Sequence, residues 1–266
     1  MIMNSKKTRA IILGAIVGAM PFCANATVIS FQQGTGGYFG TQDTELRQDN
    51  SAANFGNATS VTIDGDDSAG EFDDTNAMFR FDNIFGSAPG QIPSGATINN
   101  ANLRLYMDSG GDSILMLQML TDWNQSTATW DSLVNGIQPD GIEASFLRLL
   151  RGRDLGPNEL LGTSGTNITI EVTAELQNWA NGTSNFGWGF IPSSTANIDG
   201  VDFVTSDAPS YLGAFGFLPQ LTVDYTVDGP VDGPVNGVPE PASLALLGIG
   251  FAGLDAMRRR RLGLWR

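Results

Sequence analysis

Histidine is absent from the 266 residues, and cysteine occurs once, at Cys23. The two lysines, Lys6 and Lys7, lie in the same N-terminal stretch, so a chain that begins after residue 26 contains none of these three residue types. Their absence excludes thiol nucleophiles, Schiff-base lysines, histidine general bases and the usual zinc ligands. It also excludes disulfides, so the body of the protein must be stabilised by a hydrophobic core.

Positive charge is scarce as well. Residues 27–237 contain 26 aspartates and glutamates against six arginines, which gives this segment a net charge of −20. A surface of that sign repels nucleic acid and anionic lipid, and it attracts divalent cations. We therefore expect no nucleic-acid partner.

The first 26 residues have the order of a secretory signal peptide. A basic start is followed by an apolar stretch over residues 10–20 and by small residues at Ala24 and Ala26. This order predicts a signal helix that is removed by cleavage before Thr27. The alternative is acylation at Cys23, but the bulky sequence Met-Pro-Phe precedes that cysteine, where a lipoprotein signal has small residues.

Short runs rich in β-branched and aromatic residues recur through residues 27–227. They are SVTIDG, AMFRFDNI, ANLRLYM, SILMLQML, TNITIEV, FGWGFI, VDFVTS and PQLTVDYT, with Asp-Gly and Asn-Gly turns between them. Most runs alternate, so that Leu103 and Leu105 fall on one face and Arg104 and Tyr106 on the other. This pattern predicts a single all-β domain built as an antiparallel β-sandwich.

One segment has a helical period instead. In EVTAELQNWANG, Val172, Leu176 and Trp179 share a face, and Asn181 with Gly182 provides a stop. We expect a short helix that caps the sandwich and buries its tryptophan.

The C-terminal part differs in composition from the body. Residues 228–237 repeat Asp-Gly-Pro-Val, which predicts an extended, hydrated linker. Residues 242–254 then form an apolar helix candidate of about 13 residues, short of the roughly 20 that cross a bilayer. Asp255 and the arginine run that follows favour a transient membrane segment with a cytoplasmic C-terminus.

The tail resembles the PEP-CTERM protein-sorting signal of Gram-negative bacteria. The resemblance rests on the motif and on the basic end, namely Val238, Pro239, Glu240, Pro241, Arg258, Arg259, Arg260 and Arg261. It implies recognition by an exosortase, cleavage near the motif, and export across the inner membrane to the cell surface or the exopolysaccharide matrix. The alternative is a permanent membrane anchor.

The body resembles the DNRLRE domain, which is related to a family of carbohydrate-binding modules. The resemblance spans most of residues 42–226, and its most specific parts are IPSGATI before ANLRLYM and the segment DWNQSTATWDSL. It implies a sandwich of the jelly-roll type and polysaccharide binding.

An acidic stretch is a candidate Ca²⁺ site. Its six carboxylates are Asp64, Asp66, Asp67, Glu71, Asp73 and Asp74, which lie between two expected strands. Carboxylate oxygens are preferred Ca²⁺ ligands, but the glycine and glutamate positions of an EF-hand loop are not matched. The alternative is a solvated hairpin loop.

Two groups of residues are candidates for glycan binding. Arg148, Arg151 and Arg153 form a basic cluster suited to an acidic exopolysaccharide, with ion pairing inside the protein as the alternative. Trp123 and Trp130 offer stacking faces for sugar rings, with burial in the core as the alternative.

The sequence thus predicts four parts: a signal peptide over 1–26, a sandwich over 27–227, a linker over 228–237 and a sorting tail over 238–266. We expect an exported, non-catalytic protein that binds polysaccharide or serves as a matrix component. The alternative is a polysaccharide-degrading enzyme that uses two carboxylates, since 26 acidic residues make chance pairs inevitable.

Overall fold

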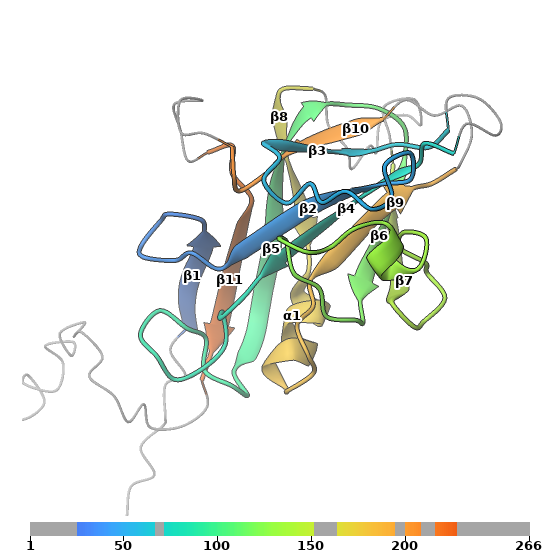
Figure 1. Cartoon of the computed structure of the whole chain (residues 1–266). Helices are drawn as coiled ribbons and strands as arrows, with labels where there is room; N and C mark the ends of the chain where they lie inside the picture. The colour runs from blue at the N-terminus through green and yellow to red at the C-terminus, as the bar shows by residue number, and fades with distance from the viewer. Residues whose placement is uncertain (1–25, 67–71, 152–163, 195–199, 209–215, 228–266) are drawn as a thin grey trace, which may run out of the picture. The chain divides into compact units, whose positions relative to one another are not determined.

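A computed structural model of the chain describes residues 26–66, 72–151, 164–194, 200–208 and 216–227 (Figure 1). The predicted signal helix, the linker, the C-terminal helix and the sorting residues Val238–Pro241 and Arg258–Arg261 lie outside these residues. Ala24, Asp67, Glu71 and Arg153 lie outside them too. In the part of the chain that is described, no helix has the length and hydropathy of a membrane span.

The described residues form two antiparallel sheets, as the strand pattern predicts. One sheet has the order β1-β11-β5-β10-β3, with β8 on the other side of β5; the second has the order β2-β4-β9-β6-β7. The strands of the first sheet are β1 (Ala26–Gln32), β3 (Ser60–Ile63), β5 (Thr97–Ser109), β8 (Thr166–Glu171), β10 (Val201–Val204) and β11 (Gln220–Thr226). Those of the second sheet are β2 (Thr41–Arg47), β4 (Thr75–Phe81), β6 (Ile114–Met119), β7 (Ala144–Leu150) and β9 (Trp188–Pro192).

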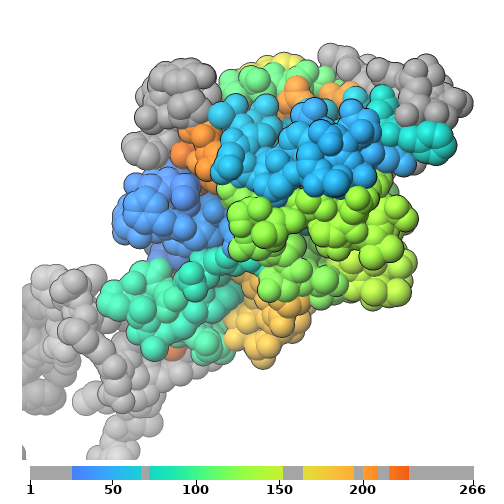
Figure 2. Space-filling view, in the orientation of Figure 1, coloured from blue at the N-terminus to red at the C-terminus, as the bar shows by residue number. Residues whose placement is uncertain are grey.

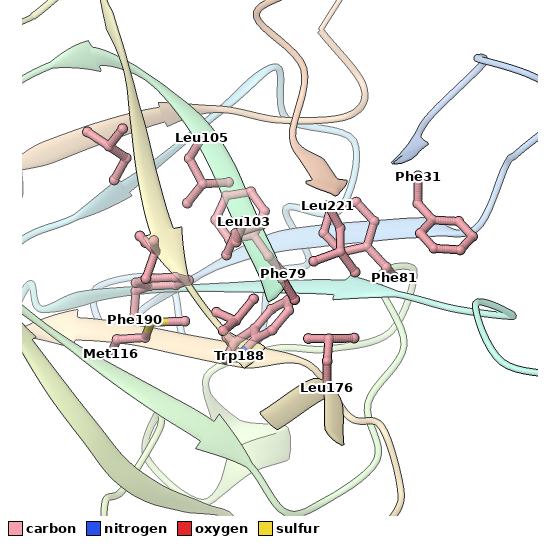
Figure 3. Packing of buried hydrophobic residues seen from close by; sticks show 14 of the residues in the cluster. Phe31, Phe79, Phe81, Leu103, Leu105, Met116, Leu176, Trp188, Phe190 and Leu221 are labelled. Carbon is pink, nitrogen blue, oxygen red and sulfur yellow. The ribbon is translucent and has the colours of Figure 1, made fainter. Parts of the chain in front are cut away.

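The main core lies between the two sheets. Leu103 and Leu105 of β5 point into it, while Arg104 and Tyr106 are only half-buried, so the predicted alternation is confirmed. Phe79 and Phe190 meet them from the second sheet, edge to face with ring centroids 5.8 Å apart (Figure 3). Both buried clusters lie within the described strands, helix and loops, so the sandwich holds its own core.

The predicted helix is α1 (Thr173–Ala180), and it caps one end of the core. Leu176 and Trp179 are buried, and Trp179 packs on Trp188 with ring centroids 5.0 Å apart. Gln177 fixes the helix to β5, because its side chain accepts a hydrogen bond from Ile98 N–H and donates one to the carbonyl of Ala96.

The outer face of the second sheet is covered by the loop between β6 and β7. This loop contains the 3-10 helix η1 (Asp131–Leu133) and buries Trp123, Trp130 and Ile137 against Leu46 of β2 and Met78 of β4. In Figure 2 the light-green atoms of the loop lie in the middle of the visible face, below blue atoms from earlier in the chain. A flat sheet face on which a polysaccharide could lie is therefore not available here.

Two buried carboxylates close the edge between β2 and β3. Glu45 Oε2 accepts a hydrogen bond of 2.6 Å from Thr62 N–H, and Asp43 Oδ2 accepts one of 2.8 Å from Ser206 N–H. Burial raises the pKa of Asp43 to about 7 and raises the pKa of Glu45 above its usual range. Glu45 thus satisfies a backbone donor of the edge strand β3, and Asp43 satisfies one in the segment after β10.

The sandwich has two distinct ends along β5. Ala26, at the start of β1, pairs with Thr226, at the end of β11, and both lie beside the first residues of β5. The last residues of β5 pair with β10, which pairs with β3, and β3 leads to a bridge between Asp64 and Thr75. β5 has 13 residues, and at about 3.3 Å per residue its ends lie up to roughly 40 Å apart.

Candidate functional site

A pocket of about 400 Å³ opens at the end of the sandwich where β3 meets β4. This size falls within the usual range for small-molecule sites. Its lining combines amides, a carboxylate and apolar side chains: Gln48, Asp74, Asn76, Trp130, Asn135, Ile137, Gln138, Pro139, Ile191 and Pro192.

Strand pairing brings the first three of these residues together. β2 and β4 run antiparallel with Leu46 opposite Asn76. The pairing continues beyond the strands, because Gln48 N–H donates to the carbonyl of Asp74 at 3.0 Å and Asp74 N–H donates to Gln48 Oε1 at 3.3 Å. One wall of the pocket is therefore fixed by a backbone ladder.

The loop after η1 forms the facing wall. Ile137 N–H donates to Asn76 Oδ1 at 3.0 Å, which ties the loop to β4. Asn135 and Gly136 both have positive φ, and a Cβ at Gly136 would lie 2.7 Å from the Trp130 ring. Only glycine fits this turn without moving the tryptophan.

The pocket carries negative charge. Asp74 lines it, and burial, together with the charge of Asp66, raises the pKa of Asp74. Asp73 adds to the same effect. No arginine or lysine is found among the lining residues that the structure describes.

A second pocket, of about 340 Å³, lies between the β1–β2 turn and the segment before β5. Two of its polar side chains, Tyr38 and Gln91, form hydrogen bonds within the protein. Tyr38 donates its hydroxyl hydrogen to the carbonyl of Asp82, and Gln91 accepts from Ala88 N–H and donates to the carbonyl of Asn83. It offers fewer groups to a ligand than the pocket beside Asp74.

Both tryptophans that the sequence singled out are buried. Trp123 is 5% exposed, its indole N–H donates to the carbonyl of Phe186 at 2.8 Å, and Arg80 lies 5.1 Å from the centre of its ring. Trp130 is 6% exposed, packs in the cluster under the loop and also lines the pocket. The structure therefore corrects the hypothesis of open stacking platforms, because the β6–β7 loop uses both rings to cover the sheet.

One member of the arginine cluster, Arg148, is paired within the protein. Arg148 of β7 forms an ion pair with Glu175 and donates to the carbonyl of Glu171. Arg151 is exposed at the end of β7, and Arg153 lies outside the described residues. The alternative interpretation, ion pairing within the protein, is thus confirmed for Arg148.

The described members of the acidic stretch are held by local hydrogen bonds. Asp66 Oδ1 accepts from Asp73 N–H, Asp74 Oδ1 accepts from Asp66 N–H, and Asp64 Oδ1 accepts from Gly65 N–H. Among the described residues, no group of three or more acidic side chains has the spacing of a metal site. The Ca²⁺ hypothesis rests in part on Asp67 and Glu71, which lie outside them.

Sequence reasoning missed the amides of the pocket. Gln48, Asn76 and Gln138 lie far apart in the chain and belong to no motif. The one local signal was the Asn135-Gly136 dipeptide, which marks the turn beside them.

Comparison with known proteins identifies the tail. Residues 237–261 match the PEP-CTERM protein-sorting motif, which confirms the prediction made for this segment. The motif implies secretion through the inner membrane of a Gram-negative bacterium, exosortase-type sorting to the cell surface, and an exosortase as the processing partner. No curated protein matches the chain.

Proposed function

We propose that the exported chain is a non-catalytic surface protein whose sandwich binds polysaccharide. The observation that carries this proposal is the polar pocket of about 400 Å³ beside Asp74, which combines hydrogen-bonding amides with apolar side chains. Sugars present both hydroxyl groups and apolar C–H faces, so a lining of this mixed kind suits them.

The position of the pocket supports the proposal. The chain leaves the sandwich after Thr226, beside the first residues of β5, whereas the pocket lies near the other end of that strand. A body sorted through its C-terminal tail would therefore be attached at one end and carry its pocket near the other.

We further propose a jelly-roll sandwich of the DNRLRE type. The strand rows β3-β10-β5-β8 and β4-β9-β6-β7 support this, because each strand of the first row has its neighbour in sequence at the same position of the second. The chain thus passes repeatedly between two four-stranded rows, as in a jelly roll. A shared fold would not by itself assign the ligand.

The absence of a catalytic role is part of the proposal. Glycoside hydrolysis needs two carboxyl groups flanking the scissile bond, and Asp74 is the one carboxylate among the described lining residues. Incubation of the protein with polysaccharides should release no reducing ends. New reducing ends that disappear in the variant Asp74→Asn would replace this proposal with an enzymatic one.

A structural matrix role is the second candidate. It is favoured by apolar side chains exposed at a sheet edge, since Phe146 of β7 is 53% exposed and Ile142 before it is 74% exposed. Such an edge suits contact between copies. Concentration-dependent association in sedimentation experiments, without affinity for any glycan, would favour this role over binding.

A glycan array tests the binding proposal directly. The sandwich, residues 27–227, would be applied to uncharged, uronate and sulfated polysaccharides with and without Ca²⁺. Binding to at least one class supports the proposal, and an effect of Ca²⁺ would identify a role for the acidic stretch. Absence of binding to all classes contradicts it.

The tail can be tested separately in the producing cell. The tail matches the PEP-CTERM motif, and this resemblance implies cleavage near Pro-Glu-Pro. We therefore expect the surface protein to lack the arginine run. The variant Glu240→Ala should accumulate uncleaved in the inner membrane. Mass spectrometry of the surface protein would contradict this if it recovered the intact C-terminus, as the permanent-anchor alternative requires.

A further inference from the structure

We infer that the pocket beside Asp74 binds an uncharged sugar. The sugar would form hydrogen bonds with the side chains of Gln48, Asn76, Gln138 and Asp74. This inference rests on the proposed polysaccharide binding and narrows its ligand class. It also runs against the expectation of an acidic polysaccharide, which depended on Arg148, Arg151 and Arg153.

The side-chain amides of Asn76 and Gln48 each have an NH₂ group that forms no hydrogen bond with the described residues. Asn76 Oδ1 accepts the hydrogen bond from Ile137 N–H, which fixes the orientation of the amide and leaves Nδ2 unbonded among the described residues. Gln48 Oε1 likewise accepts a hydrogen bond from Asp74 N–H, and Gln48 Nε2 is unbonded among the described residues. Each NH₂ group offers donors to sugar oxygens.

Two further groups retain acceptors. Gln138 donates a hydrogen bond from Nε2 to the carbonyl of Asn135, and Gln138 Oε1 is unbonded among the described residues. Asp74 accepts from Asp66 N–H at Oδ1 and leaves Oδ2 unbonded among the described residues. A sugar hydroxyl is both donor and acceptor, so neighbouring hydroxyls can use an amide NH₂ and a carboxylate together.

The charge of the pocket selects against acidic sugars. Asp74 supplies a negative charge inside the lining, and Asp66 and Asp73 add two more at its edge. No described lining residue is cationic, and Arg148 is already paired with Glu175. A uronate or sulfate group would lose its hydration and meet repulsion, whereas an uncharged hexose would not.

The apolar side chains of the pocket lining suit the C–H face of a sugar ring. Ile137, Ile191 and Pro192 lie beside the polar groups, with the edge of Trp130. These side chains can contact the C–H face of a sugar ring while the amides and the carboxylate bind its hydroxyls. Specificity for the sugar then comes from a few polar side chains whose positions are fixed beside the apolar ones.

The test is affinity electrophoresis of the sandwich, residues 27–227, in gels that contain laminarin, mannan, xylan, alginate or polygalacturonate. The variants are Asp74→Asn, which removes the charge with little change of shape, and Gln138→Ala at the exposed rim. Asp131→Asn, an exposed residue of the same loop that does not line the pocket, is the matched control. Unchanged thermal unfolding would establish that each variant is folded.

We expect retardation by at least one uncharged polysaccharide, with affinity reduced roughly tenfold or more in Asp74→Asn and less in Gln138→Ala. The control should bind like the wild type. Retardation should also change little between about 0.05 and 0.5 M NaCl, since an uncharged ligand makes no ion pair.

Other results separate this inference from the broader proposal. Retardation by alginate or polygalacturonate alone would overturn the uncharged ligand class but leave polysaccharide binding in place. Retardation by uncharged polymers that the pocket variants do not alter would overturn the assignment of the site. No retardation in any gel would contradict both the inference and the proposed function.

Discussion

Replacing Asp43 with asparagine should change how the stability of the sandwich depends on pH. Asp43 is 1% exposed, and its Oδ1 has no hydrogen-bond partner among the described residues, while Oδ2 accepts from Ser206 N–H. Burial disfavours the charged form and raises the pKa to about 7, and the charge of Asp207 adds to the effect. An asparagine keeps an acceptor for Ser206 and carries no charge at any pH.

The magnitude follows from the two pKa values. The pKa of this carboxyl is about 7 in the folded protein, and in the unfolded chain it has the ordinary aspartate value of about 3.8. A difference of about three pKa units corresponds to about 4 kcal/mol. Because the folded state binds the proton more tightly, the wild type loses this free energy of unfolding as pH rises from about 4 to about 7.

The difference between variant and wild type removes other pH effects from the measurement. We expect the free energy of unfolding of Asp43→Asn minus that of the wild type to rise by about 4 kcal/mol from pH 4 to pH 8. A constant offset of about 1–3 kcal/mol, from burying the new amide hydrogens, does not alter this rise.

Urea unfolding of both proteins across this pH range measures the quantity, with Asp131→Asn as the exposed control. A difference that stays constant within about 0.5 kcal/mol from pH 4 to pH 8 would show that burial does not raise the pKa of Asp43. It would mean that Asp43 is charged in the folded state down to the same pH as in the unfolded chain.

Two further predictions concern the loop that covers the second sheet. Gly136→Ala should lower the free energy of unfolding by about 1–3 kcal/mol more than Gly95→Ala, because both glycines have φ +78° but only at position 136 would the new Cβ meet Trp130; thermal unfolding measures the difference, and equal losses would contradict the close fit. Trp123→Phe should cost about 1–3 kcal/mol, because the carbonyl of Phe186 loses its donor. Urea unfolding that detects no change would show that this hydrogen bond is not required.

The parts of the fold that the sequence predicted have strong local signals. The alternation over residues 101–107 became β5, and the helical spacing of Leu176 and Trp179 became α1. The Pro and Gly of residues 93–95 form a turn before β5, with Gly95 at positive φ and Ala96 N–H donating to the carbonyl of Pro93. In each case a few adjacent residues contain the necessary information.

Three strands were not predicted, and the clearest reason is found in β2. β2 reads TQDTELR, and polar residues at most of its positions argue against a buried strand. Asp43 and Glu45 are nonetheless buried, because they satisfy backbone donors of Ser206 and Thr62 across the sheet edge. β1 and β7 were not predicted either. β1 begins beside the predicted cleavage site, and β7 contains Arg148, which was interpreted as part of a basic cluster.

The pocket depends on tertiary structure in the same way. Gln48 meets Asp74 through the register of β2 and β4, and the loop that carries Gln138 reaches them only when Trp130 and Ile137 pack on the sheet. The tryptophans were identified from the sequence, but their role is to hold this loop. No spacing pattern could have predicted that amides from three segments converge.

Whether this pocket binds an uncharged sugar can be decided by NMR titration. On addition of the oligosaccharide unit of a retained polymer, we expect the side-chain NH₂ signals of Gln48, Asn76 and Gln138 to shift together, with saturation at one site. Shifts concentrated near Arg148 and Arg151, with these three signals unchanged, would show that the sugar binds elsewhere.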